Sequence, residues 1–64
     1  MRYQVLVTNE PMQDFTCIVS AIDYASRHVY LEWDNGILAI ETLENGKDFT
    51  YSYGFKEVLI SVIP

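Results

Sequence analysis

The stretch EWDNGILAIETLENGKDF, which runs from Glu32 to Phe49, contains the dipeptide Asn-Gly twice, ten residues apart. Asn-Gly readily adopts the positive φ angles of a type I′ turn, and this turn joins the two strands of a tight antiparallel hairpin. We therefore expect hairpin turns at Asn35-Gly36 and at Asn45-Gly46, with strands before, between and after them.

The two expected turns define one register for three strands. Directly opposed residues of an antiparallel pair share a face of the sheet, and each turn, taken alone, places Leu38, Ile40 and Thr42 on the same face. The rows that result are Trp33–Leu38–Tyr53, Leu31–Ile40–Tyr51 and Val29–Thr42–Phe49. This agreement predicts a meander whose core face carries these side chains.

The rest of the chain also favours strands. Tyr3 to Thr8, Phe15 to Ile22 and Val58 to Ile63 are each rich in apolar or β-branched residues, as half-buried strands are. We expect a turn from Asp23 to Arg27 and a short 3₁₀ turn over Phe55-Lys56-Glu57. The β-branched and aromatic content disfavours helices throughout.

The expected fold is all-β, with five or six antiparallel strands in a single small domain over residues 1–64. An open sheet would leave two strand edges exposed, and closure into a barrel removes them. We therefore predict a closed SH3-like barrel in which the first and last strands meet. An OB-like barrel and an open meander sheet are the alternatives.

The charge balance limits the partners. The net charge is −5, which argues against direct binding to nucleic acid, since nucleic-acid binders carry basic patches. A basic protein partner is expected, and no membrane partner, because no apolar run approaches the length of a membrane helix.

The single cysteine, Cys17, lies in an apolar run and is predicted to be a buried, inert thiol. We expect a cytoplasmic protein of a bacterial or other host cell.

The predicted register gives the sheet an acidic outer face, which is the candidate partner-binding site. Its carboxylates are Glu32, Asp34, Glu41 and Asp48, and its flanking aromatic and polar contacts are His28, Tyr30, Thr50 and Tyr24. Half of the chain is hydrophobic, which is more than one small core can bury, so a homo-oligomer is a further expectation.

No arrangement in the sequence indicates catalysis. His28 with Glu32 and Glu41 falls short of the ligand sets that metal sites use, and the three glycines are isolated. We expect no catalytic residue, no metal site and no cofactor, and we predict that the protein is not an enzyme.

The predicted function is that of a small acidic interaction protein. It would inhibit or regulate a partner by binding a basic, nucleic-acid-binding surface as a nucleic-acid mimic, as acidic proteins of phages and mobile elements do. The alternatives are an SH3-like module that binds a peptide or sequesters a small ligand, and an oligomeric structural or assembly subunit.

Overall fold

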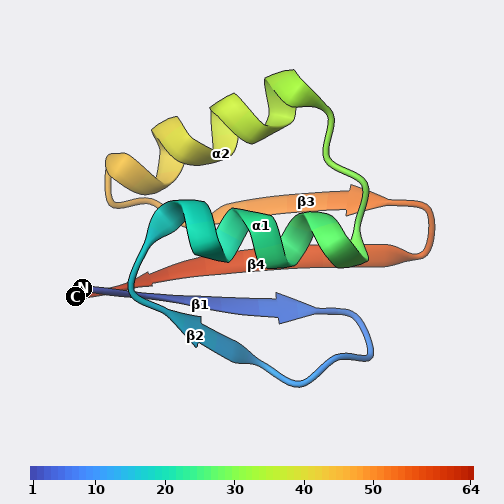
Figure 1. Ribbon diagram of the computed structural model, residues 1–64, viewed down its shortest axis with the longest axis horizontal. Coiled ribbons are helices and arrows are strands. Elements are labelled where there is room, and N and C mark those ends of the chain that lie inside the picture. Colours follow the sequence, from blue (N-terminus) through green and yellow to red (C-terminus); the bar gives the residue numbers. More distant parts are fainter.

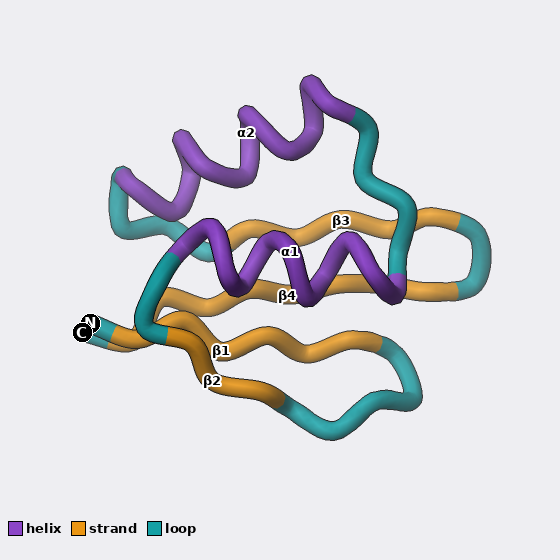
Figure 2. The backbone as a smooth tube through the Cα atoms, in the orientation of Figure 1, coloured by secondary structure: helices purple, strands orange, loops and turns teal.

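The computed structural model describes residues 1–64 and contains both helices and strands (Figures 1 and 2). The predicted all-β class is therefore wrong. In chain order the elements are β1 (Arg2–Val7), β2 (Gln13–Phe15), α1 (Ile18–His28), α2 (Trp33–Glu44), β3 (Phe49–Tyr53) and β4 (Lys56–Ile63).

The four strands form one antiparallel sheet in the order β2-β1-β4-β3. The sheet is open, so neither an SH3-like nor an OB-like barrel is present. It is not a meander either, because its two central strands, β1 and β4, come from opposite ends of the chain. The expected meeting of the first and last strands is confirmed by the pairing of Arg2 with Ile63 and of Val7 with Val58. Both termini consequently lie side by side (Figure 1).

Helix α1 occupies the second half of the strand predicted from Phe15 to Ile22 and the turn predicted from Asp23 to Arg27, while Phe15 ends β2. A helix buries residues three and four apart. Ile18, Ala21, Ile22, Ala25 and Val29 follow this spacing, and all five are buried or half-buried. The helical stripe therefore determines this segment, rather than the apolar alternation.

Helix α2 occupies the strand predicted between the two doublets and the predicted turn at Asn35-Gly36, which lies in the first turns of the helix. Most of the strand predicted before that turn forms the connection from α1 to α2. Gly36 does not have a positive φ, whereas Gly46 does, at 76°. Gly46 N–H donates to the Leu43 carbonyl (3.0 Å) and Lys47 N–H donates to the Thr42 carbonyl (3.1 Å). These two bonds are those of the Schellman motif, which ends a helix with a left-handed glycine. The second doublet therefore ends a helix and does not join two strands.

The predicted strands at Tyr3 to Thr8, Phe49 to Tyr53 and Val58 to Ile63 are confirmed as β1, β3 and β4. The predicted 3₁₀ turn at Phe55 to Glu57 is wrong, because β4 already begins at Lys56. A two-residue loop, Gly54-Phe55, joins β3 to β4, with Tyr53 paired to Lys56. Gly54 has φ 64°, which fits a type II′ turn with glycine first.

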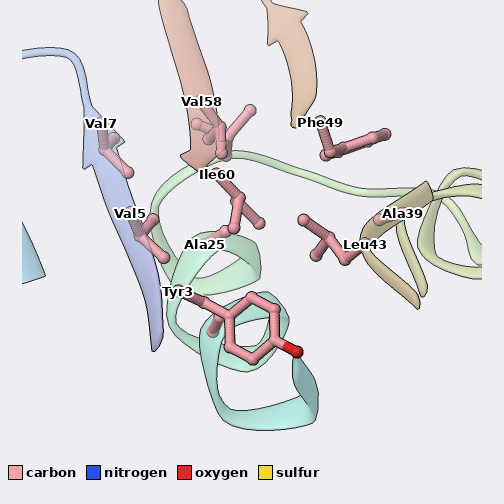
Figure 3. Packing of buried hydrophobic residues seen from close by; sticks show 11 residues of the cluster. Tyr3, Val5, Val7, Ala25, Ala39, Leu43, Phe49, Val58 and Ile60 are labelled. Carbon is pink, nitrogen blue, oxygen red and sulfur yellow. The ribbon is translucent and has the colours of Figure 1, made fainter. Parts of the chain in front are cut away.

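The core lies between the helices and one face of the sheet (Figure 3). The sheet contributes alternate residues of its strands, among them Val5, Val58 and Ile60, and α2 contributes Leu43. Three buried alanines, Ala21, Ala25 and Ala39, lie on the inner faces of the helices. Small side chains there allow the helix backbones to approach the sheet and each other.

The opposite face of the sheet carries no helix. Leu6 is exposed there, and Leu59 and Ile63 are half-buried, which is common for an antiparallel sheet with one solvated face. Neither α1 nor α2 has the length and hydrophobicity of a membrane-spanning segment.

Candidate functional site

The side of α2 that points away from the core combines carboxylates with large apolar side chains. Ala39 and Leu43 are the buried residues on the inner side of the helix. The opposite side, which we call the acidic α2 face, consists of Trp33, Asp34, Ile37, Leu38, Glu41 and Glu44, all of them exposed. Trp33 is 83% exposed and Leu38 is 53% exposed. Exposed tryptophan and leucine among carboxylates are unusual for a surface that meets only water.

The charge of this face is not balanced locally. Between Arg27 and Lys47 the chain has four carboxylates, at Glu32, Asp34, Glu41 and Glu44, and no lysine or arginine. Both ion pairs of the protein lie elsewhere: Arg2 contacts Asp14 (3.6 Å) and Arg27 contacts Asp23 (2.9 Å). The net negative charge is therefore concentrated on α2.

Two of these carboxylates occupy positions that the helix itself disfavours. Glu41 and Glu44 lie near the C-terminus of α2, which has no basic residue in its last turn. The helix dipole makes this end negative, so a carboxylate there is destabilising and a lysine would be favourable. Helix stability therefore does not account for Glu41 and Glu44.

An aromatic pair lies where the α1–α2 connection passes the end of β3. The rings of Tyr30 and Tyr53 are 5.6 Å apart, and both residues are exposed. Phe55, at the tip of the β3–β4 hairpin, is fully exposed. This end of the molecule thus presents additional apolar surface close to the start of α2.

The structure does not bring all the predicted site residues together. Glu32 is the residue before α2, and Asp34 and Glu41 lie on the helix seven residues apart, which places them on one side. Asp48 lies beyond the end of α2, where its carboxylate accepts a hydrogen bond from Val62 N–H (3.0 Å). Asp48 therefore has a long-range contact with β4, whereas the Asp34 carboxylate accepts only from the adjacent Asn35 N–H (3.0 Å).

The expected flanking residues are also dispersed. Tyr24, on α1, lies with its ring 5.4 Å from that of Phe15 and 4.8 Å from that of His28. This half-buried group packs α1 against β2 and lies apart from the acidic α2 face. Thr50 pairs with Leu59, so its side chain belongs to the uncovered face of the sheet. Only Tyr30 remains near the N-terminal end of α2.

A shallow hollow of ≈ 880 Å³ lies at one end of the sheet. It is lined by residues of β1, β3, β4 and the turn after β1, among them Leu6, Thr50, Glu57 and Leu59. Two carboxylates, Glu10 and Glu57, border it, and no group of three His, Cys, Asp or Glu residues forms a metal-binding arrangement in the protein.

Sequence reasoning assigned Trp33, Leu38 and Tyr53 to the core, and all three are exposed. For Leu38 the correct signal is the helical spacing of Gly36, Ala39, Ile40 and Leu43, all buried or half-buried, which leaves Leu38 on the other side of α2. Trp33 is exposed as the first residue of α2, and Tyr53 as the last residue of β3. Cys17 was also misassigned, since it is exposed just before α1.

The chain matches no protein-family model, and no curated protein or solved structure matches it at a significant level.

Proposed function

We propose that this protein binds a basic surface of another protein through the acidic α2 face, and that it regulates or inhibits its partner by occupying that surface. The observation that carries the proposal is the combination on one helix of exposed Trp33, Ile37 and Leu38 with carboxylates that form no ion pair. Tryptophan is enriched among the residues that dominate binding energy, and complementary charge speeds association and selects the partner.

The position of the charge supports binding over simple solubility. A solubilising carboxylate serves equally well anywhere on the surface. Glu41 and Glu44 instead lie at the helix end where negative charge lowers stability. A residue that weakens its own helix and has no partner within the chain is the pattern expected where a partner outside the chain provides the compensating charge.

The test compares two substitutions that change the net charge equally. Glu41→Lys reverses a charge on the acidic α2 face, and Glu10→Lys does so in the turn region between β1 and β2. The partner is captured from the native host by crosslinking and purified, and the Kd is measured for each variant at two salt concentrations. We expect Glu41→Lys to weaken binding by about ten-fold or more and Glu10→Lys to have little effect.

A loss of folding would not explain the expected result, because lysine near the C-terminus of a helix is favoured by the helix dipole. Trp33→Ala tests the apolar part of the same surface, and it should weaken binding about ten-fold with little change in the salt dependence. Equal effects of Glu41→Lys and Glu10→Lys would show that only net charge matters and would refute the assignment to α2.

A further inference from the structure

We propose that the outer edge of β3 accepts an extended, basic segment of a partner protein as a fifth strand of the sheet. The charge of this occupant rests on the function proposed above, whereas the strand addition is an independent property of the β3 edge. The recognition mode is β-augmentation, in which main-chain hydrogen bonds supply much of the affinity.

The first observation is that β3 has unpaired main-chain groups along its outer edge. The two-residue loop makes Tyr53 and Lys56 the hydrogen-bonded pair that closes the hairpin. Bonded and non-bonded pairs alternate in an antiparallel ladder, so Phe49 and Tyr51 also bond to β4. Thr50 and Ser52 therefore direct their N–H and C=O groups outward, and no hydrogen bond outside the ladder satisfies them.

The second observation is that the strand β3 itself has no charge, proline or bulge of the kind that protects many edge strands. Protected edges are short or carry charges, prolines or bulges. The opposite edge strand, β2, has only three residues, includes Asp14 in an ion pair with Arg2, and closely follows Pro11. By contrast, β3 has five residues, FTYSY, with no charge and no proline, and it pairs with β4 without a bulge.

The third observation is that the helical layer extends further than the sheet. Helix α1 packs on β1, β2 and β4, while α2 packs on α1 and β3. In Figures 1 and 2, α2 lies past β3, on the side away from β4. An added strand beside β3 would therefore lie beneath α2.

The same geometry decides between a partner segment and a second copy of the chain. If two copies paired antiparallel through β3, each α2 would lie over the junction on the same face, and the two helices would overlap. Each copy also carries a net charge of −5, which opposes self-association. A single extended segment brings no helix, and the net negative charge of the chain favours lysine or arginine in it.

The experiment uses the capped peptide Lys-Val-Lys-Val-Lys as a probe of the intact protein. Amide hydrogen exchange is followed by NMR as the peptide is added to saturation. We expect exchange of the Thr50 and Ser52 amides to slow about ten-fold or more, because both gain a hydrogen-bond partner. The Tyr51 amide, already bonded to β4, should change little.

Three controls separate the possible causes of binding. The fully N-methylated peptide keeps the same charges and carbonyl oxygens, but its methyl groups replace the N–H donors and prevent close pairing of the two strands, so it should protect neither amide. The peptide Glu-Val-Glu-Val-Glu should bind at least about ten-fold more weakly. Thr50→Pro removes one outward N–H at a position that an edge strand tolerates, and it should reduce peptide binding. If this variant does not fold, the N-methylated peptide alone decides.

Each contrary result has a distinct meaning. Unchanged exchange at Thr50 and Ser52, or equal protection by the N-methylated peptide, overturns the strand addition. If the basic peptide then shifts only resonances of α2, the strand addition is wrong but the proposed function of the acidic α2 face still stands. Equal binding of the acidic peptide overturns the basic occupant. Protection of Thr50 and Ser52 that rises with protein concentration, without peptide, would identify a second copy as the occupant and overturn the proposal.

Discussion

Cys17 lies at the start of α1, where backbone amides of the helix act on its thiol. It occupies the N-cap position of α1, is exposed, and makes no side-chain hydrogen bond of standard capping geometry. The backbone N–H groups of Ser20 and Val19 nevertheless point toward the sulfur and lower the pKa of the Cys17 thiol. The free amides at the start of a helix favour the thiolate.

The rate of alkylation of Cys17 should follow this lowered pKa. With iodoacetamide, the rate is expected to rise with pH to a midpoint below about 8.5, the value of an unperturbed cysteine. The urea-unfolded chain provides the reference, and its midpoint should be higher. Equal midpoints in the folded and unfolded chains would contradict the assigned role of the helix amides.

Stability should depend on pH for the same reason. The pKa of Cys17 is lower in the folded state than in the unfolded chain. The thiolate therefore stabilises the folded protein fully at pH values above the unfolded pKa, and this stabilisation disappears as the pH falls through the folded pKa. The free energy of unfolding of the native chain, relative to Cys17→Ser, should therefore rise as the pH approaches about 8.5. Denaturant titrations of both proteins at several pH values would measure the difference in free energy of unfolding. A difference that does not change with pH would exclude the effect.

At the scale of the elements, replacement of the glycine by alanine should have opposite effects on stability in the two Asn-Gly doublets, one within α2 and one at its end. Gly36 lies within the helix without a positive φ, and an added Cβ would meet no atom within 4 Å. Gly36→Ala should raise the free energy of unfolding by about 0.5–1 kcal/mol.

Gly46→Ala is the matched substitution at the end of the helix. Space is available there too, but the φ of 76° is strained for a residue with a Cβ. We expect a loss of about 1 kcal/mol. Chemical denaturation of the two variants would measure both changes. A change in the free energy of unfolding of the same sign at the two glycines would disprove the Schellman assignment.

The doublets also explain which elements could be predicted from sequence. Strands β1, β3 and β4 were predictable because their alternation has no competing period. Asn-Gly fits both a hairpin turn and a helix end, since each places the glycine at a positive φ. The residues before Asn45 settle the choice: Leu38, Ala39 and Glu41 form helices well, and Ala39 with Leu43 has helical spacing.

The candidate site depended on the same choice of period. Exposure of Glu32, Asp34 and Glu41 could be predicted because charged groups remain solvated. Their neighbours could not, since a period of two placed Leu38 in the core and a period of 3.6 places it outside. Asp48 and Thr50 were grouped with them only through a register that the sheet does not have.

At the scale of the whole molecule, the small core makes stability sensitive to Leu43, the largest fully buried side chain. Leu43 connects α2 to the sheet (Figure 3). Leu43→Ala should cost about 2–5 kcal/mol, and each kcal/mol lowers the Tm of a domain this small by about 4–8 °C. Thermal unfolding followed by circular dichroism would measure the change.

Leu38→Ala is the control for that measurement, because Leu38 belongs to the same helix but lies on its exposed side. Its effect on stability should stay within about 0.5 kcal/mol. Comparable losses at the two leucines would mean that α2 is oriented differently from the structure described above.

The adjacent ends of the chain determine how the molecule responds to force. Its first and last strands are neighbours at the centre of the sheet, and Arg2 faces Ile63. Hydrogen bonds of an antiparallel pair lie perpendicular to the strands. Tension applied between the two ends therefore loads these bonds one after another, as in a zipper, and never all together. The sheet should open in its middle at low force and separate the β1–β2–α1 half from the α2–β3–β4 half.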